Sequence, residues 1–281
     1  MNRAMAGKVC LVTGANSGLG RATAAELARL GATVVMVCRN AGRAEPVRQA
    51  IRRETGNNDI DLLIADLSSQ QSIRELAATF RQRYDRLHVL VNNAGAIFLH
   101  RETTVDGLEA TFALNHLGYF LLTNLLLDLL KASAPARIVS VSSGAHSTGR
   151  IDFADLQAER RYFVWRAYSQ SKLANILFTA ELARRLEGTG VTANCLHPGF
   201  VRSSIAADTA LGRFAFGLLK PFSTPAEKAA KTPVYLATSP EVEGVTGKYF
   251  ANQRPVRPSQ LSMDPELARR LWQVSAELTH L

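Results

Sequence analysis

The sequence predicts a single α/β domain built on a doubly wound, seven-stranded parallel sheet with helices on both faces. Three observations favour this fold class. Short apolar runs alternate with segments of helical period along all 281 residues. The apolar runs are rich in Val, Ile and Leu without polar alternation, which is typical of strands buried on both faces. No linker, repeat or low-complexity tract divides the chain, so we expect one domain over residues 1–281.

A glycine-rich turn joins the first predicted strand to the first predicted helix. The apolar run that ends at Thr13 is followed by Gly14, Gly18 and Gly20, and helical periodicity starts at once. Glycines let the backbone approach a pyrophosphate closely, and the amides at the helix N-terminus hold that anion. The spacing is G-x-x-x-G-x-G rather than the commoner G-x-G-x-x-G. By itself the turn fits a tight strand-to-helix connection as well as a dinucleotide site.

The other elements follow in strand–helix alternation, which implies right-handed crossovers within one sheet. Strands are predicted at residues 8–13, 33–38, 60–65, 87–91, 136–141, 191–196 and 248–251. Helices are predicted at residues 18–30, 41–55, 69–84, 105–131, 162–187, 225–238 and 265–278. An irregular connection at about 200–224 is long for a compact domain, and such connections are usually functional.

Composition indicates a globular protein and argues against other classes. The hydrophobic fraction of 47% is sufficient for a sizeable core. No stretch approaches about eighteen uninterrupted apolar residues, and Met1 to Gly7 is too short and too polar for a signal peptide. The net charge of +9 comes from basic residues dispersed along helices, which favours a solvated surface over nucleic-acid binding. We therefore expect a cytoplasmic protein with no membrane span and no nucleic-acid partner.

The three cysteines are predicted to be buried thiols. Cys10, Cys38 and Cys195 each lie in an apolar, strand-like run, and an odd count argues against a disulfide framework. Neither these cysteines nor the six histidines show metal-ligand spacing. No metal site is predicted.

Polar residues follow three of the predicted strands, at the edge of the sheet where ligands of an open α/β fold bind. The run from Asn92 to Gly95 follows the fourth strand, and Ser142 and Ser143 follow the fifth. Pro198 and Gly199, with Ser203 further on, follow the sixth. These ends are therefore the candidate site.

Tyr168 and Lys172 lie four residues apart in the predicted helix 162–187, and therefore on one helical face. A free phenol has a pKa of about 10 and is a poor base at neutral pH. A neighbouring ammonium stabilises the phenolate and lowers that pKa. Tyr168 could then exchange a proton with a substrate oxygen while hydride moves to or from a nicotinamide. A Tyr–Lys pair of this spacing is also common on helix surfaces, so the pair alone is weak evidence.

Together these motifs resemble those of the short-chain dehydrogenase/reductase family over essentially the whole chain. The family pattern T-G-x-x-x-G-x-G begins at Thr13, and the N-N-A-G turn ends at Gly95. The resemblance implies a Rossmann fold, a nicotinamide cofactor and oxidoreductase activity. It implies cofactor contacts from Gly14, Asn16, Ser17, Gly18, Leu19, Gly20, Asp66 (at the adenine), Leu67, Asn93, Ala94, Gly95, Tyr168, Lys172, Pro198, Gly199, Val201 and Ser203 (at the carboxamide).

The resemblance also implies roles for a catalytic set. Tyr168 would be the general acid/base, and Lys172 would lower its pKa and hold the nicotinamide ribose. Ser143 would donate a hydrogen bond to the substrate oxygen, with Ser142 as the competing candidate. Asn115 would anchor a water that links Lys172 to solvent. All of these residue types are intact.

The end of the second strand distinguishes NAD from NADP. NAD binders place an acidic residue there, which accepts from the ribose 2′-hydroxyl. Here Cys38 stands at that position and Arg39 follows it. A guanidinium suits a 2′-phosphate. NADP(H) is therefore the predicted cofactor, the alternative being that Arg39 is only a surface residue.

The substrate is predicted to be a small lipophilic alcohol or carbonyl compound. The apolar side chains of the connection are typical of a flap that closes an apolar pocket, or of a short amphipathic helix packed on the core. Segments such as Ser169 to Asn175 resemble the retinol dehydrogenase and WW-domain oxidoreductase-like branch of the family. Many membrane-attached members carry an N-terminal hydrophobic anchor not found before the first strand here, which favours an aldehyde or ketone other than a retinoid. The flap residues concerned are Leu211, Phe214, Phe216, Leu218 and Leu219.

Two other functions fit the same fold. A non-catalytic NADP-sensing regulator would need no proton donor, so the intact Asn-Ser-Tyr-Lys set argues against it. A reductase of carbon–carbon double bonds would share the Tyr and the Lys. Homo-oligomers are usual in the family, although no interface motif is evident in the sequence.

Overall fold

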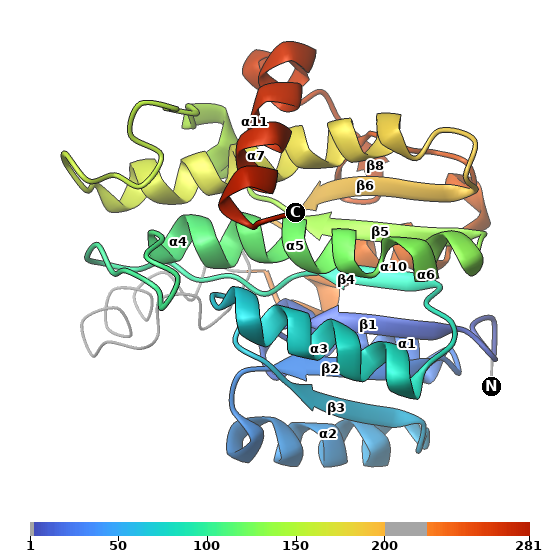
Figure 1. The fold of residues 1–281 in the computed structure, drawn as a ribbon. Coiled ribbons are helices and arrows are strands. Elements are labelled where there is room, and N and C mark those ends of the chain that lie inside the picture. The colour runs from blue at the N-terminus through green and yellow to red at the C-terminus, as the bar shows by residue number, and fades with distance from the viewer. Residues whose placement is uncertain (1–2, 200–223) are drawn as a thin grey trace.

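The computed structural model describes residues 3–199 and 224–281, and this part of the chain folds around one eight-stranded sheet (Figure 1). The strand order is β3-β2-β1-β4-β5-β6-β7-β8, parallel throughout except that β8 is antiparallel to β7. The predicted doubly wound α/β fold is confirmed, and a two-residue edge strand is added to the seven expected. The strands are β1 (Val9–Thr13), β2 (Thr33–Cys38), β3 (Ile60–Ile64), β4 (Val89–Asn92), β5 (Ala136–Val141), β6 (Val191–His197), β7 (Tyr249–Ala251) and β8 (Arg254–Pro255).

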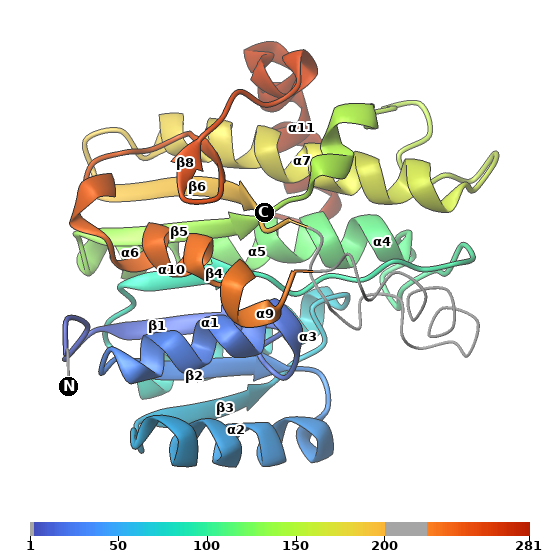
Figure 2. The same cartoon turned by 180° about the vertical axis from the view of Figure 1, so that it is seen from behind.

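Helices cover both faces of this sheet. One face carries α3 (Gln70–Arg83), α5 (Gly118–Leu125) and α7 (Val164–Arg185), which lie in front in Figure 1. The other face, in front in Figure 2, carries α1 (Gly18–Arg29), α2 (Ala41–Thr55) and α10 (Lys231–Thr238).

The side chains of successive strand residues point to opposite faces of the sheet and pack against its two helical layers alternately. Leu11 packs into the core beneath α3, α5 and α7, whereas Val12 packs into the core beneath α1, α2 and α10. Both side chains are fully buried. Strands covered on both faces therefore explain the continuous apolar runs in the sequence.

Local signals in the sequence set the bounds of several helices. The Asn40 side chain accepts a hydrogen bond from Arg43 N (2.9 Å) at the start of α2, and α2 ends at Gly56, whose φ of +68° favours glycine. Asp264 caps the C-terminal helix α11 (Pro265–Leu278) in the same manner, through the amides of Glu266 and Leu267.

The predicted helix 105–131 is wrong at its start and in its continuity. Gly107 has a φ of +77°, which a helix does not tolerate, and the helix begins only at Ala110. The Glu109 carboxylate caps that start by accepting hydrogen bonds from Thr111 N (2.7 Å) and Phe112 N (2.8 Å). Apolar periodicity alone cannot reveal such interruptions. The stretch is divided into α4 (Ala110–Phe112), the π-helix η1 (Ala113–Leu117), α5 and α6 (Leu127–Ala132).

The C-terminal part of the chain completes the fold. The predicted helix 225–238 is divided into α9 (Ala226–Ala229) and α10, while α11 packs across α7 on the outside of the molecule (Figure 1). Short helices connect these elements: η2 (Gly144–Thr148), η4 (Pro240–Val242) and η5 (Gln260–Met263). The predicted flap, with Val201 and Ser203, lies outside the described residues except for Thr224.

All three cysteines are free and buried, as predicted. Burial raises the pKa of Cys10 and of Cys195 to about 12, and that of Cys38 to about 11. The thiols are therefore protonated at neutral pH.

Within residues 3–199 and 224–281, none of the helices combines the length and the apolar character needed to cross a bilayer. The same residues contain no group of three or more His, Cys, Asp or Glu side chains placed to hold a metal ion.

Candidate active site

The predicted site residues gather at the carboxyl ends of the central strands, where the arrowheads point to the left in Figure 1. Gly14 follows β1, Asn93 follows β4, Ser143 follows β5 and Pro198 follows β6. Because β1, β4, β5 and β6 are neighbours in one parallel sheet, these four segments lie side by side.

The glycine turn is closely packed at the N-terminus of α1. Gly14 and Gly18 have φ values of +65° and +50°, in the left-handed region that favours glycine. A Cβ on Gly20 would lie 2.3 Å from Gly14 O and 2.4 Å from Asn93 Nδ2. The backbone of the turn is therefore packed too closely for a side chain at Gly20, and a glycine turn at a helix N-terminus suits a pyrophosphate.

Thr13 joins this turn to the segment after β4. Its Oγ1 accepts hydrogen bonds from Asn93 N (2.8 Å) and Ala94 N (3.0 Å) and donates to Val91 O (3.3 Å). Asn93 Nδ2 donates in return to Thr13 O (2.7 Å). Asn93 and Ala94 are predicted cofactor contacts, whereas this structural role of Thr13 was not predicted. The place of Thr13 in the T-G pattern is the signal that could have indicated it.

Arg39 and Asp66 stand at the ends of the neighbouring strands β2 and β3. Arg39 is exposed. Asp66 Oδ1 accepts from Ser68 N (2.9 Å) and Ser68 Oγ (2.6 Å), and these bonds fix the carboxylate without using Oδ2. Leu67 beside it is buried. Arg39 and Asp66 therefore stand at the edge where the adenosine half of a dinucleotide is predicted to lie.

Tyr168 and Ser143 form the centre of the site. Tyr168 is 8% exposed, and Ser143 is half-buried at the start of η2, where its Oγ accepts from Ala145 N (3.2 Å). Burial raises the pKa of Tyr168, and a hydrogen bond with Ser143 partly offsets that rise. The two hydroxyls therefore lie together.

Ser142 is turned away from this pair. It is buried, and its hydroxyl donates to the main-chain oxygen of Lys172 (2.7 Å). Of the two candidate serines, Ser143 is the one beside Tyr168.

Lys172 is buried beneath the phenol ring. Its Nζ lies over the ring of Tyr168, 5.6 Å from the centroid, and over that of Tyr119 at 5.9 Å, and it donates to Val141 O (3.4 Å). Burial lowers the pKa of Lys172 to about 8. Burial is the largest influence on the pKa of Tyr168 in this structure, and the lowering of that pKa by Lys172 stays a prediction.

Asn115 lies in the π-helix η1, and it is fully buried. Its Nδ2 donates to Ala96 O (3.0 Å) and Ser171 Oγ (3.1 Å), and its Oδ1 accepts from Ala96 N (2.9 Å). A Cβ on Gly95 would lie 3.0 Å from Asn115 Oδ1 and 3.5 Å from Lys172 Nζ, so a side chain there would crowd Asn115. Single π turns are frequent at functional sites.

The end of β6 closes the other side of the site. Pro198 and Gly199 follow His197, and Gly199 has a φ of +83°. His197 Nδ1 accepts from Gly144 N (3.1 Å), so β6 is joined to the residue after Ser143. His197 was not among the predicted site residues.

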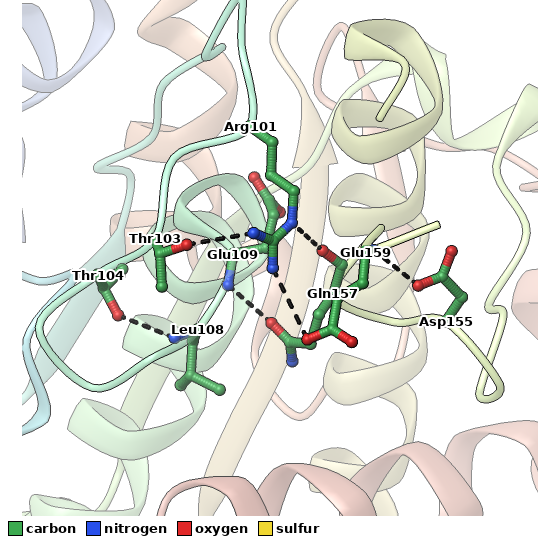
Figure 3. A network of polar contacts seen from close by, with 8 residues as sticks. All are labelled: Arg101, Thr103, Thr104, Leu108, Glu109, Asp155, Gln157 and Glu159. Carbon is green, nitrogen blue, oxygen red and sulfur yellow. Dashed lines mark hydrogen bonds and ion pairs between the residues drawn. The ribbon is translucent and has the colours of Figure 1, made fainter. Parts of the chain in front are cut away.

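Two segments beside the site are held together by Arg101 (Figure 3). Its Nε donates to Gln157 O (2.9 Å), its Nη1 donates to Thr103 Oγ1 (3.2 Å), and its Nη2 lies 3.8 Å from Glu159 Oε1. Gln157 Oε1 also accepts from Glu109 N (2.7 Å), at the cap of the helix that leads to Asn115. The loop after β4 and the loop before α7 are therefore one connected unit.

A separate pocket of about 800 Å³ lies at the opposite edge of the sheet, and it contains none of the predicted site residues. Its lining includes Lys8, His88 and Arg137, near the amino ends of β1, β4 and β5.

Comparison with known proteins gives consistent results. Residues 8–212 match the family described as short chain dehydrogenase. Mouse (Mus musculus) retinol dehydrogenase 14 is 50% identical over 96% of this chain and 85% of its own length. Human (Homo sapiens) retinol dehydrogenase 13 is 47% identical over 98% of this chain and 85% of its own length.

Solved structures share the fold. An uncharacterised protein of Mycobacterium paratuberculosis has a TM-score of 0.80 and 35% identity, covering 98% of this chain and 94% of its own. A short chain dehydrogenase of Shigella flexneri complexed with NADP has a TM-score of 0.73 and 27% identity, covering 90% of this chain and all of its own.

Proposed function

The chain belongs to the short-chain dehydrogenase family, in its retinol dehydrogenase branch, and we propose that it interconverts a lipophilic alcohol and its aldehyde or ketone with NADP(H). The observation that carries this proposal is the meeting of Ser143, Tyr168 and Lys172 at the carboxyl edge of the sheet, beside the glycine turn. A proton donor, a second hydroxyl and a buried cation next to an anion-binding turn are what hydride transfer to a carbonyl needs.

Tyr168 is proposed as the general acid/base. When bound, NADP(H) supplies or accepts the hydride. In reduction, the Tyr168 hydroxyl gives its proton to the carbonyl oxygen, and in oxidation the Tyr168 oxygen takes the proton of the alcohol. A pKa raised by burial keeps the phenol protonated at neutral pH, which suits the acid role. Ser143 donates a hydrogen bond to the same substrate oxygen and orients it.

Lys172 and Asn115 are proposed to supply and guide the proton. The buried ammonium of Lys172 faces the Tyr168 ring and would hold the nicotinamide ribose. Asn115, held by Ala96 and Ser171, lies next to Lys172 across Gly95 and would anchor the water that connects the ammonium to solvent.

The preference for NADP(H) is proposed from Arg39. Its place after β2 suits the 2′-phosphate, and Cys38 leaves the usual carboxylate position without an acid. The solved complexes of related dehydrogenases from Shigella flexneri with NADP and from Escherichia coli with NADPH support this choice.

The substrate class is proposed from the named relatives and from the apolar side chains of the connection outside the described residues. A lipophilic carbonyl, with retinal as one candidate, fits both. We further propose that the protein works in the cytoplasm, since its three thiols are free and buried.

The test is a substrate screen with purified protein. NADPH and NADH oxidation would be followed with retinal, long-chain aldehydes, steroid ketones and enones, and the products would be identified by mass spectrometry. Tyr168→Phe serves as the matched control. We expect an alcohol product and a strong preference for NADPH. A saturated ketone formed from an enone would instead identify a double-bond reductase. NADPH binding without any turnover would identify a sensor.

A further inference from the structure

A buried hydrogen bond links the C-terminal helix to the π-helix that carries Asn115. His116 Nε2 lies 2.9 Å from Ser275 Oγ of α11, 159 residues further along the chain. His116 and Ser275 are both buried, with at most 1% of either exposed. Because His116 directly follows Asn115, α11 contacts the site through the neighbouring residue in the chain.

The helix that provides this contact is firmly packed. Trp272 of α11 stacks on Phe178, with ring centroids 5.7 Å apart, and meets Phe120 edge-on at 4.9 Å. The end of α11 is held by α3, because Arg74 Nη2 donates to Thr279 O (2.7 Å) and Gln70 Nε2 donates to Leu278 O (2.7 Å). These contacts fix α11, and with it the position of Ser275.

The hydrogen bonds around His116 allow two arrangements, which differ in the atom that receives the hydroxyl proton of Ser275. Ser275 has one hydroxyl proton, and its oxygen lies 2.7 Å from Leu271 O and 2.9 Å from His116 Nε2. If the proton goes to Leu271, the proton of the neutral imidazole must sit on Nε2, and Nδ1 is left as a buried acceptor without a donor. If the proton goes to Nε2, the imidazole proton sits on Nδ1 and can be donated.

The second arrangement satisfies two atoms that are otherwise unpartnered. His116 Nδ1 and Asn175 Oδ1 are both buried without a hydrogen bond of normal geometry to any described residue, although Asn175 is close enough to oppose the lowering of the His116 pKa by burial. In the second arrangement Nδ1–H is the donor that Asn175 Oδ1 lacks. Leaving both atoms unpaired would be unfavourable, since a buried polar group without a partner loses its hydrogen bonds to water and gains none in the protein.

Asn175 continues this connection to the catalytic lysine. Its Nδ2 donates to Val141 O (3.3 Å), the same carbonyl that lies 3.4 Å from Lys172 Nζ. A buried chain of polar groups thus runs from Ser275 to Lys172 through His116, Asn175 and Val141 O.

We propose that His116 is a positioning residue through which α11 sets the placement of Asn115 and Lys172, with Ser275 donating to Nε2 and Nδ1 donating to Asn175. This inference rests on the proposed function, since it concerns the geometry of the same site. Small displacements of positioned groups reduce rates strongly without abolishing binding.

The kinetic test compares Ser275→Ala with a matched control in the same helix. Thr279 is also buried, but its hydroxyl donates only to carbonyls of α11, at Ser275 O (2.6 Å) and Ala276 O (3.4 Å), so Thr279→Ala removes a similar group without touching η1. We expect Ser275→Ala to lower kcat by about tenfold with the NADPH Kd within about twofold. Thr279→Ala should stay within about twofold in both, and Ser275→Thr, which keeps the hydroxyl, should restore most of kcat.

A second readout does not depend on activity. The ¹⁵N shifts of the imidazole nitrogens distinguish the two neutral tautomers, and the His116 signals can be assigned by their loss in His116→Phe. A proton on Nδ1 is expected. A proton on Nε2, or equal kcat in Ser275→Ala and Thr279→Ala, would overturn the inference while leaving the proposed function intact. A wild type without turnover on any substrate would overturn the function, and the positioning role with it.

Discussion

The hydroxyl of Ser142 donates a 2.7 Å hydrogen bond to the main-chain oxygen of Lys172, and this bond ties the end of β5 to the middle of α7. The hydroxyl proton of Ser142 is therefore engaged in a structural hydrogen bond. The next residue, Ser143, is left to pair with Tyr168. Two adjacent serines of the same chemistry therefore have different tasks, which can be separated experimentally.

We predict that Ser143→Ala lowers kcat by ~10²–10³, because a hydrogen bond to developing charge on the substrate oxygen is lost. Ser142→Ala should instead lower the free energy of unfolding by about 1 kcal/mol with little effect on kcat. Steady-state kinetics and urea unfolding of both variants check this. Equal or reversed losses of kcat would transfer the role to Ser142.

Tyr168→Phe should lower kcat by ~10²–10⁴, since the ring remains but the exchangeable proton is gone. Cofactor affinity should change little, because the side chain of Lys172 is intact. Stopped-flow hydride transfer and NADPH fluorescence titration measure the two quantities separately. Near-normal turnover by a folded variant would remove Tyr168 from the mechanism.

Arg39→Ala should weaken NADPH selectively. A charge-assisted bond to the 2′-phosphate corresponds to roughly 10–100-fold in affinity, so kcat/KM with NADPH should fall by that factor while the value with NADH is nearly unchanged. Steady-state kinetics with both cofactors tests this. A wild type that is indifferent to the phosphate would contradict the proposed role.

Cys38→Asp is the complementary change. Burial raises the pKa of the Cys38 thiol, and backbone hydrogen bonds from Ala15 and Asn16 offset part of that rise, so the same amides can stabilise a carboxylate at that position. An acid there would accept from the ribose diol and repel the phosphate. We expect the ratio of kcat/KM values to move toward NADH, and an unchanged ratio would show that the side chain does not reach the ribose.

Lys172→Met should make the protein more stable at neutral pH. The folded-state pKa of about 8 lies below the ordinary value of about 10.4, so burying the charged amine costs about 3 kcal/mol at pH 7. Between the two pKa values the unfolded chain binds more protons, so that cost disappears as the pH rises from about 8 to 10.4. Urea unfolding of wild type and variant should show a stability gain at pH 7 that shrinks toward pH 10. A constant difference would indicate that Lys172 is not buried as a cation.

The sequence predicted the parts of the site that depend on local spacing. Glycines at Gly14, Gly18 and Gly20 and the i, i+4 pair of Tyr168 and Lys172 need only the local geometry of a turn and a helix, and the structure places them at one edge of the sheet. The buried strands were equally evident from their apolar runs.

What the sequence could not predict depends on contacts between distant segments. Neither the hydrogen bond of His116 to Ser275 nor that of Thr13 to Asn93 leaves a periodic pattern in the sequence. The π turn of η1 was missed because it inserts a residue into an otherwise apolar helix without changing its composition. The i, i+4 spacing of Tyr168 and Lys172 is visible in the sequence, whereas the burial that raises the pKa of Tyr168 depends on the packing of distant segments.

The burial of all three thiols has a consequence for handling and for kinetics. Alkylating reagents attack thiolates, and Cys10, Cys38 and Cys195 are both shielded and protonated in the folded protein. Alkylation of these thiols therefore requires local or global unfolding that exposes them. The rate of cysteine modification in the absence of denaturant thus measures how often the sheet opens, at the three strands β1, β2 and β6, and storage without reductant should not inactivate the folded protein.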